Sequence, residues 1–555
     1  RWERRVTTYG SARWAERRDL VKAKLLGGDG VFLGRWNGDY LRHDGPEHVM
    51  AFAPTRSGKG VGLVIPTLLS WTGSAVIHDI KGENWELTSG WRSRLGPCIR
   101  FDPTDDVSPR YNPLLEVRKG KFEVRDVQNI ADILVDPVGS HESRDHWDKT
   151  GYALLVAVML HVLYAEDINS LAGCSEFLSH PQRTIGETLE LMLNTAHLVG
   201  GDGCGRVHPY VARGARAMKN KSENERSGVL STTLTLLEVF SDPIIADLTS
   251  TSDWGVMDLV EAERPVSLYL VVPPSDISRT RPLMRLILNQ VGRRLTERSP
   301  CNGRRKVLLM LDEFPALGRL DFFETALAFL AGYGIRAFLI GQSLNQIEKA
   351  YGPNNAILDN CHVRVAFATN DERTAKRISE ALGAKTELRS QKNYTGHRLA
   401  PWLSHMMVSR QETARQLLTP GEVMQLPPKQ EVVMVAGVPP VMADKLRYFK
   451  DRNFTERVLA PARMALEATG PVSLWSNMVE PETSVAIASN TAAEDGGKDL
   501  RPELDKQPMR EVEVEGAAID LSDDDPLDPT DAQHLQTIRR AATLDRSDPD
   551  TLPEF

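Results

Sequence analysis

Residues 53–60 read Ala-Pro-Thr-Arg-Ser-Gly-Lys-Gly and have the form of a phosphate-binding loop. In the general pattern Gly-x-x-x-x-Gly-Lys-Ser/Thr, backbone N–H groups cradle the phosphates, the lysine reaches the β and γ oxygens, and the final hydroxyl holds Mg²⁺. Gly58 and Lys59 are present, whereas Ala53 replaces the first glycine and Gly60 replaces the hydroxyl. The loop therefore predicts nucleotide binding with one magnesium ligand missing.

The residues around this loop favour the same interpretation. An apolar run at 48–54 leads into it and a helical pattern at 61–70 follows, although Pro66 should kink that helix. This context is what the motif requires, because a helix N-terminus helps to bind phosphate. The residues that we expect to contact the nucleotide are Thr55, Arg56, Ser57, Gly58, Lys59, Gly60 and Val61.

A second motif at 307–313 is an apolar run that ends in Asp312 and Glu313. Asp312 can hold Mg²⁺ and Glu313 can polarise the attacking water, which is the division of labour that phosphoryl transfer needs. Without a phosphate-binding loop, a solvated acidic turn would be the better interpretation. Asp79 also follows an apolar run and is an alternative metal ligand, with Glu83 nearby. We favour Asp312 because its run is wholly apolar and Glu313 follows at once.

Gln342 ends a third strand-like run, where an amide can sense the γ-phosphate or orient water. A glutamine that merely caps a strand end is the simpler alternative. If the protein forms a ring, an arginine from the neighbouring subunit is needed at the nucleotide. Arg336, Arg364 and Arg373 are candidates by spacing alone, and a surface arginine is the default interpretation of each.

The strand and helix patterns predict an α/β fold with a mainly parallel central sheet of the RecA-like type. The strand-like runs are 48–54, 74–79, 98–102, 266–272, 307–312, 337–340, 363–368 and 431–436. Helical patterns dominate 112–259, which predicts an inserted all-α domain. The predicted boundaries are a lead-in at 1–46, a nucleotide-binding domain at 47–111 and 260–465, the all-α domain, and a tail at 466–555.

Composition excludes several classes of protein. The five cysteines have no metal-binding or disulfide-framework spacing, and the longest apolar run, 152–165, is too short to span a bilayer and fits a buried helix. Residues 480–555 carry a net charge of −13, so the rest of the chain is +5, which leaves room for a nucleic-acid-binding surface. The tail is expected to be disordered apart from a short helix at 532–543.

Three longer segments together resemble the TraG family of type IV secretion coupling proteins. They are residues 53–69, the His-Asp-Ile-Lys-Gly-Glu-Asn of 78–84 and the Leu-Asp-Glu-Phe-Pro-Ala-Leu-Gly of 311–318. Shorter matches lie at 10–15, 341–346 and 417–423, so the similarity runs from about residue 9 to 450. The family's loop often has glycine after the lysine, so Gly60 agrees with this branch. Its acidic pair corresponds to Asp312 and Glu313, and its strand-end glutamine to Gln342.

The resemblance implies an ATPase of the bacterial inner membrane, active on the cytoplasmic face and assembled as a homo-hexamer. Its cofactors would be ATP and Mg²⁺, and its partners single- and double-stranded DNA without sequence specificity, the relaxase or relaxosome, and components of the secretion channel. The family's membrane anchor lies upstream of the matched region. Two alternatives stay open: a nucleotide-gated adaptor that does not pump, and a recruiter of protein effectors.

Overall fold

The computed structural model describes residues 7–136, 146–199, 204–297, 305–395, 405–463 and 475. The predictions of a disordered tail after residue 466 and of a helix at 532–543 concern residues outside this range, with the exception of Trp475. That side chain is only 3% exposed, so one residue of the predicted tail is packed against the body of the protein.

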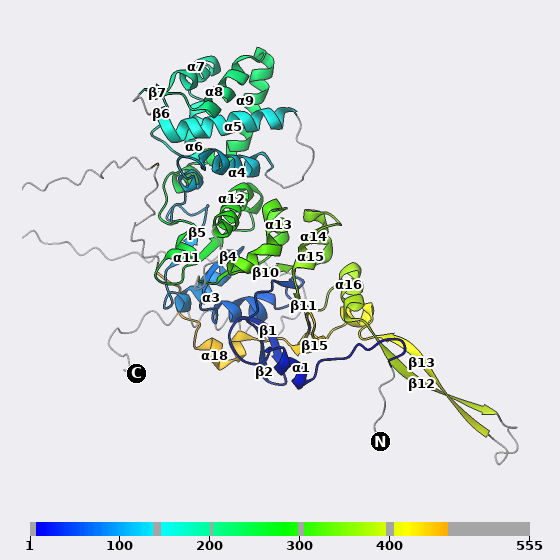
Figure 1. Cartoon of the computed structure of the whole chain (residues 1–555). Helices are drawn as coiled ribbons and strands as arrows, with labels where there is room; N and C mark the ends of the chain where they lie inside the picture. Colours follow the sequence, from blue (N-terminus) through cyan, green and yellow to red (C-terminus); the bar gives the residue numbers. More distant parts are fainter. Residues whose placement is uncertain are drawn as a thin grey trace, which may run out of the picture. The chain divides into compact units, whose positions relative to one another are not determined.

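A mixed eleven-stranded sheet forms the centre of the described chain, in the order β2-β1-β15-β14-β11-β3-β10-β9-β4-β8-β5 (Figure 1). The strands from β11 to β5 are parallel, and β14, β15, β1 and β2 continue the sheet with antiparallel pairing. The mainly parallel sheet predicted from the sequence is therefore present. The strands are β1 (Val31–Trp36), β2 (Asp39–His43), β3 (Val49–Phe52), β4 (Ser74–Asp79), β5 (Cys98–Phe101), β8 (Ser267–Val271), β9 (Val307–Leu311), β10 (Ile335–Gly341), β11 (Val363–Ala366), β14 (Gln430–Val435) and β15 (Val441–Asp444).

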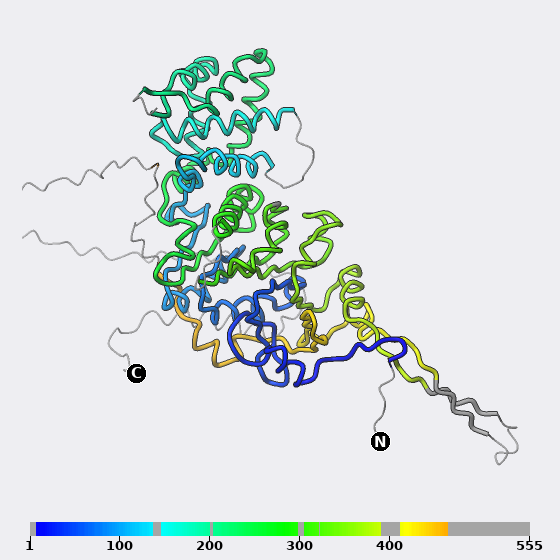
Figure 2. Tube along the Cα trace, in the orientation of Figure 1, coloured from blue at the N-terminus to red at the C-terminus, as the bar shows by residue number. Residues whose placement is uncertain are grey.

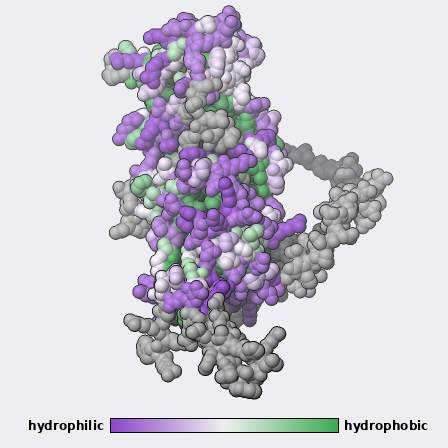
Figure 3. All heavy atoms as spheres, turned by 90° about the vertical axis from the view of Figure 1, so that its right-hand side faces the viewer, coloured by the Kyte–Doolittle hydropathy of each residue, from purple (hydrophilic) through white to green (hydrophobic). Residues whose placement is uncertain are grey.

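Apart from the partly exposed edge strand β5, the parallel strands are buried on both faces, which explains why their sequences are mostly continuous apolar runs. In β3, Met50 and Phe52 enter one core cluster while Val49 and Ala51 enter another, because successive side chains point to opposite faces. Helices α12 (Ile277–Thr296) and α13 (Asp321–Leu330) contribute to the first cluster, and α2 (Ile65–Leu68) and α3 (Glu83–Arg92) to the second. The face drawn in Figure 3 is mostly hydrophilic, as expected when the apolar side chains are inside.

Strands β1 and β2 correct the prediction for residues 1–46, in which no strand was expected. They form a hairpin at the edge of the main sheet, joined by Asn37 and Gly38, which both have positive φ angles of 48° and 91°. Asn-Gly between two strands is a strong hairpin signal that the sequence contained. The short helix α1 (Arg17–Lys22) precedes this hairpin.

Helices fill the chain between β5 and β8, and Figure 1 shows most of them gathered together. They are α4 (Glu123–Val135), α5 (His146–Ala165), α6 (Leu171–Leu178), α7 (Ile185–Asn194), α8 (Pro209–Lys219), α9 (Glu223–Leu237), α10 (Pro243–Leu248) and α11 (Asp258–Glu261), with a two-residue ladder of β6 (Leu198–Val199) and β7 (Gly205–Arg206). Residues 154–163 of α5 are buried among them. In the described part of the chain, no helix has the length and apolar character needed to cross a bilayer.

The remaining elements follow β10. They are α14 (Leu344–Tyr351), α15 (Ile357–Asn360), α16 (Glu372–Leu382), α17 (Pro420–Met424), α18 (Arg452–Thr455) and the strands β12 (Ala384–Thr395) and β13 (His405–Gln416). The last two strands form a separate antiparallel ladder, which begins directly after α16 (Figure 2). This hairpin was not predicted, because its polar sequence lacks the apolar alternation of a half-buried strand.

Three buried histidines form a hydrogen-bonded chain among the helices. His161 Nδ1 lies 2.8 Å from His197 Nε2, and the His208 backbone N–H donates to His197 Nδ1 over 3.2 Å. Burial, together with the neighbouring His197 and Arg183, lowers the pKa of His161 to about 3. Burial and the neighbouring His208 lower the pKa of His197 to about 4.

These low pKa values predict loss of stability in acid. An unfolded histidine has a pKa of about 6.5, so between this pH and about 4 the unfolded chain binds protons that the folded chain does not. Folding stability should therefore fall with falling pH, by up to about 1.4 kcal/mol per pH unit for each histidine. Chemical unfolding at several pH values gives the free energy of unfolding of the wild type and of His161→Phe. The difference between the two isolates the contribution of His161, because the contributions of the other titrating groups are common to both proteins. His146→Ala, at an exposed histidine, is the control, and equal slopes for wild type and His161→Phe would contradict the prediction.

Candidate nucleotide site

The phosphate-binding loop begins at the carboxyl end of β3. The Ala53 backbone N–H donates to the Gly341 carbonyl over 3.0 Å, so this residue continues the sheet pairing. Ala53 lacks a positive φ angle, which removes the need for glycine there. Left-handed backbone is found instead at Arg56 and Gly58, with φ angles of 59° and 88°. The first departure from the general motif is thus compatible with the turn.

The second departure, Gly60, starts an irregular helix. Residues Gly60–Val64 form a π-helical turn in which Ile65 N–H bonds to the Gly60 carbonyl, and α2 follows with Pro66 in its first turn. The wider turn accommodates the proline that was expected to kink the helix. A Cβ placed on Gly58 or Gly60 would meet no atom within 4 Å, so the loop borders open space on this side.

Lys59 joins the two motifs that lie 254 residues apart in the sequence. Its Nζ lies 2.6 Å from Glu313 Oε2 and 2.9 Å from Asp312 Oδ1. Burial alone would lower the pKa of Lys59, but the charges of Asp312 and Glu313 outweigh this, and the pKa is raised. The residues predicted to bind phosphate and to carry catalysis therefore meet at one edge of the sheet.

The acidic pair is held in an unusual backbone conformation. Glu313 has a φ angle of 57°, a left-handed geometry that costs a non-glycine residue about 1–2 kcal/mol. The Asp312 carbonyl is braced by His78 Nδ1 at 2.8 Å. Burial lowers the pKa of His78, so it is neutral and can donate one N–H to this carbonyl. The role of His78 was missed, although the sequence placed it beside Asp79 at the end of a neighbouring strand.

Asp79 has a structural role that supports the preference for Asp312. Its Oδ2 accepts the Trp85 backbone N–H at 2.9 Å, in the first turn of α3, and the side chain is 2% exposed. Burial raises the pKa of Asp79 to about 6. The carboxylate is thus used to hold the start of α3, and Glu83 is an exposed residue of that turn.

Gln342 follows β10, which pairs with β3 on one side and β9 on the other. It therefore lies at the same edge as Lys59 and the acidic pair. Its backbone N–H donates to Gln346 Oε1 over 3.0 Å.

The other residues of the loop differ in how they are held. Thr55 and Arg56 are exposed, and Ser57 is held by a hydrogen bond that its Oγ donates to the Pro54 carbonyl. The predicted roles of Gln342 and of the individual loop residues stay predictions.

One contributor to the loop could not be found from the sequence. Lys445 Nζ donates to the Ser57 carbonyl over 3.0 Å and lies 3.9 Å from the Phe367 ring centroid. Burial lowers the pKa of Lys445. It follows β15, and nothing in its local sequence indicates contact with a loop almost 400 residues earlier.

The three candidate arginines are separated by the fold. Arg336 is at the opposite, amino end of β10, is 4% exposed, and donates to the Asp44 carbonyl over 2.7 Å. Arg364 donates to the carbonyls of Leu358 and Cys361. Arg373 lies at the start of α16, at the same edge as the loop, with 69% of its side chain exposed and an ion pair to Glu348. Only Arg373 of the three is free to reach a neighbouring molecule.

The donor set fits a magnesium–nucleotide ligand. Among the described residues, Glu313 Oε1 is buried without a hydrogen-bond partner, and the buried Asp312 Oδ1 is held by its ion pair with Lys59. Carboxylate oxygens are ligands that Mg²⁺ prefers, usually together with water and substrate phosphates. Lys59, the loop N–H groups and the open space beside Gly58 and Gly60 provide for the phosphates.

Comparison with known proteins agrees with this geometry. The family model for type IV secretory system conjugative DNA transfer matches residues 5–469. The conjugal transfer protein TraG of Escherichia coli is 41% identical over 505 residues, covering 82% of this chain and 78% of the relative. Protein VirD4 of Rhizobium radiobacter is 31% identical over 526 residues, covering 88% and 72%.

Solved structures share the fold. The bacterial conjugative coupling protein TrwBdeltaN70 in complex with sulphate aligns with a TM-score of 0.61 at 17% identity, over 80% of this chain and 95% of that one. TrwB in complex with ADP and Mg²⁺ aligns with a TM-score of 0.57 at 18% identity, over 79% and 94%. The predicted RecA-like P-loop fold is thereby confirmed. The chain belongs to the type IV secretory system family of conjugative DNA transfer, as the resemblance of its motifs indicated.

Proposed function

We propose that this chain is an ATP-driven coupling protein of a conjugative type IV secretion system, linking a relaxase–DNA complex to the secretion channel and helping to move single-stranded DNA. The observation that carries the proposal is the meeting of Lys59 with Asp312 and Glu313 within 2.9 Å. The named relatives and the family, which concern conjugal transfer and coupling, support the substrate class.

In the proposed site, the N–H groups of 55–61 and Lys59 bind the ATP phosphates. Asp312 would hold Mg²⁺, which supplies charge neutralisation to the phosphates when bound. Glu313 would orient and deprotonate the attacking water, and Gln342 would contact the γ-phosphate or that water. Arg373 is the arginine best placed to act on the nucleotide of a neighbouring subunit. Complexes of TrwB with an ATP analogue and with ADP and Mg²⁺ support these ligands.

The proposed assembly is a homo-hexamer on the cytoplasmic face of the inner membrane. Its other partners would be channel components and both single- and double-stranded DNA, bound through phosphates without sequence specificity. We propose that the nucleotide-binding domain consists of residues 47–111 and 260–465. Residues 31–43 belong to it as well, because β1 and β2 extend the same sheet. Residues 112–259 form the proposed all-α domain that docks substrate, and 466–555 the tail.

The proposal is tested by measuring ATP hydrolysis by protein whose oligomeric state has been verified. ATP turnover should rise at least about tenfold on adding single-stranded DNA, because a ring that grips DNA completes sites between subunits. The stimulation should fall with increasing salt, since phosphate contacts release counterions. Glu313→Gln oligomers assayed in parallel measure the background. A DNA-independent rate in an oligomer that binds DNA would contradict the translocase.

A second candidate is a nucleotide-gated adaptor that does not pump, and the observation that favours it is Gly60. Without the usual hydroxyl ligand the site holds Mg²⁺ through fewer protein atoms, which slows turnover. Single-turnover hydrolysis with and without single-stranded DNA separates the two functions. Flat, slow rates combined with nucleotide-dependent binding of relaxase would favour the adaptor.

A further inference from the structure

The segment after α18 is fastened to the two helices that follow β3 and β4. Arg457 Nη1 donates to the Leu69 carbonyl over 3.0 Å and to Ser70 Oγ over 3.2 Å, just beyond α2. Its guanidinium lies 5.1 Å from the ring centroid of Trp91 in α3. Further on, the Ala462 backbone N–H donates to Ser89 Oγ over 3.0 Å. This stretch therefore packs on the helix that starts in the phosphate-binding loop.

The packing is close enough to require a glycine. A Cβ on Gly90 of α3 would lie 2.0 Å from the Ala460 carbonyl oxygen, which no side chain tolerates. Gly90 is helical, where glycine costs about 1 kcal/mol relative to alanine. Its presence there is explained by the approach of the C-terminal segment.

Trp475 is buried at a second place, among the helices between β5 and β8. Its indole N–H donates to the Val117 carbonyl over 2.6 Å, and its ring meets Tyr164 of α5 edge-on with centroids 4.8 Å apart. Lys119 Nζ lies 4.8 Å from the centroid of the Trp475 ring. Asn169 Nδ2 donates to the Trp475 carbonyl over 3.1 Å. Both the side chain and the backbone of this residue are thus held.

The residues that surround Trp475 are themselves hydrogen-bonded to other residues of the protein. The Tyr164 hydroxyl donates to Glu123 Oε2 over 2.8 Å, and Glu123 Oε1 lies 3.1 Å from His208 Nε2. Asn112 Nδ2 donates to the Asn169 carbonyl over 2.7 Å. These bonds fix the walls of the site, so the contact with Trp475 is specific in geometry.

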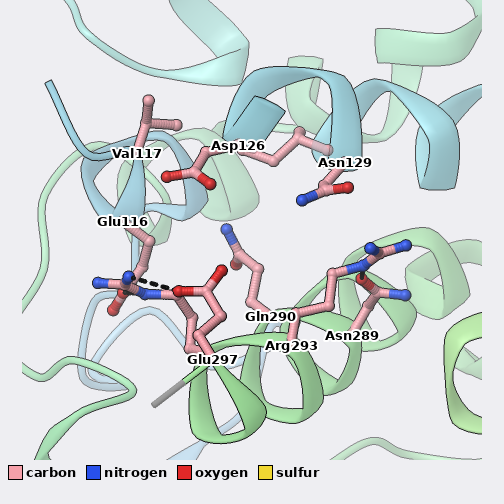
Figure 4. Close-up of a pocket in the computed structure, with 10 residues that line it drawn as sticks. Glu116, Val117, Asp126, Asn129, Asn289, Gln290, Arg293 and Glu297 are labelled. Atoms are coloured by element: carbon pink, nitrogen blue, oxygen red, sulfur yellow. Dashed lines mark hydrogen bonds and ion pairs between the residues drawn. The ribbon is translucent and has the colours of Figure 1, made fainter. Parts of the chain in front are cut away.

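The floor of the site is also linked to α12. Figure 4 shows Val117 beside Glu116 and Asp126, with Glu297 of the α12 end below them. Arg118, the next residue, pairs with Asp126 at 2.7 Å and with Glu297 at 2.5 Å. Through the neighbouring Arg118, Val117 is therefore connected to the end of α12, the helix that follows β8.

We propose that Trp475 is an anchor that docks this chain's own C-terminal segment into a site formed by Val117, Lys119, Tyr164 and Asn169. Since residues 457–462 of the same segment are held on α3, the anchor joins the helices beside the phosphate-binding loop to α5 and to the stretch that precedes α4. The occupant of the site is the C-terminal segment itself, and this docking is independent of the proposed chemistry.

Hydrogen exchange on the full chain tests the anchor. In Trp475→Ala, amides of peptides covering 114–124 and 458–463 should exchange about tenfold faster than in the wild type, because one bond and one ring contact of about 1.4 kcal/mol are lost. Trp475→Phe keeps the ring and loses the N–H bond, so it should lie between the two. Trp147→Ala, at a partly exposed tryptophan of α5, should leave both peptides unchanged.

Each other outcome counts against the proposal. Faster exchange at 114–124 alone would show local packing by Trp475 without a link to α3, and unchanged exchange at both peptides would remove the anchor altogether. Should Trp475→Ala lose its cooperative unfolding transition, the comparison rests on Trp475→Phe and on Lys119→Met, which removes the cation and keeps the stem. Wild-type exchange at both peptides in these two variants would overturn the inference.

Discussion

Replacing Lys59 by alanine is expected to weaken ATP binding by about 100-fold or more. Lysine contacts to phosphate oxygens are charge-assisted hydrogen bonds worth about 1.5–3 kcal/mol each, and a lysine in this motif makes them to two phosphates. Titration with a fluorescent ATP analogue in the presence of Mg²⁺ measures the loss. Lys81→Ala is the matched control, because Lys81 is an exposed lysine close to the same edge of the sheet.

The same substitution should destabilise the nucleotide-free protein. Lys59 pairs with both Asp312 and Glu313, which are only 21% and 16% exposed, so its removal leaves two close carboxylates unpaired. We expect a loss of about 1–2 kcal/mol, less than for a fully buried pair because these groups reach water. The raised pKa of Lys59 means that the ammonium is fully charged at neutral pH, and that on the alkaline side the stabilisation from this pair is lost only as the pH rises above the ordinary range of a lysine. Wild-type ATP affinity in Lys59→Ala would show that the nucleotide site has been assigned wrongly.

Glu313→Gln should leave ATP bound and stop its turnover. The amide keeps the size and a hydrogen-bonding oxygen but cannot accept a proton, and loss of a general base slows reactions by about 100-fold or more. Nucleotide that stays with the oligomer through gel filtration, together with single-turnover rates, measures both effects. Glutamine also accepts the positive φ angle no worse than glutamate, so the fold should be unaffected.

Two further variants test the roles assigned to the acidic residues. Glu83→Gln changes an exposed carboxylate at the alternative acidic strand end and should hydrolyse ATP at the wild-type rate. Asp312→Asn should shift the Mg²⁺ dependence to higher concentration, because one metal ligand loses its charge. Turnover at the wild-type rate in Glu313→Gln, or loss of turnover in Glu83→Gln, would contradict the assigned roles.

The parallel part of the sheet was predictable because burial on both faces leaves a continuous apolar run. Strand β4 was expected at 74–79 and spans Ser74–Asp79, and β9 was expected at 307–312 and spans Val307–Leu311. Since the motifs follow such strands, and parallel strands end at the same edge, the meeting of Lys59 with Asp312 and Glu313 also followed from the sequence.

The missing parts depend on contacts between distant residues. Strand β1 is antiparallel and lies next to the edge strand β2, so its sequence lacks a long apolar run. Gly34 is required by its φ angle of 123° and by the Asp444 carbonyl oxygen and Glu431 Oε1, which a Cβ there would approach to 3.1 and 2.0 Å. Lys445 reaches the loop from the far end of the domain. A single tryptophan shortly before the acidic stretch gives no local sign that it is buried. In each case the partner that gives the residue its role is hundreds of positions away.

The pairing of Lys59 with both carboxylates has a consequence for the order in which ligands arrive. Lys59 offsets one of the two carboxylate charges, so an incoming phosphate must draw the ammonium away from two anions that would then repel it. A divalent cation arriving together with the nucleotide satisfies those anions at the same moment. We therefore expect the metal-bound form of the nucleotide to be the species that loads, and chelation of the cation to slow loading as well as turnover.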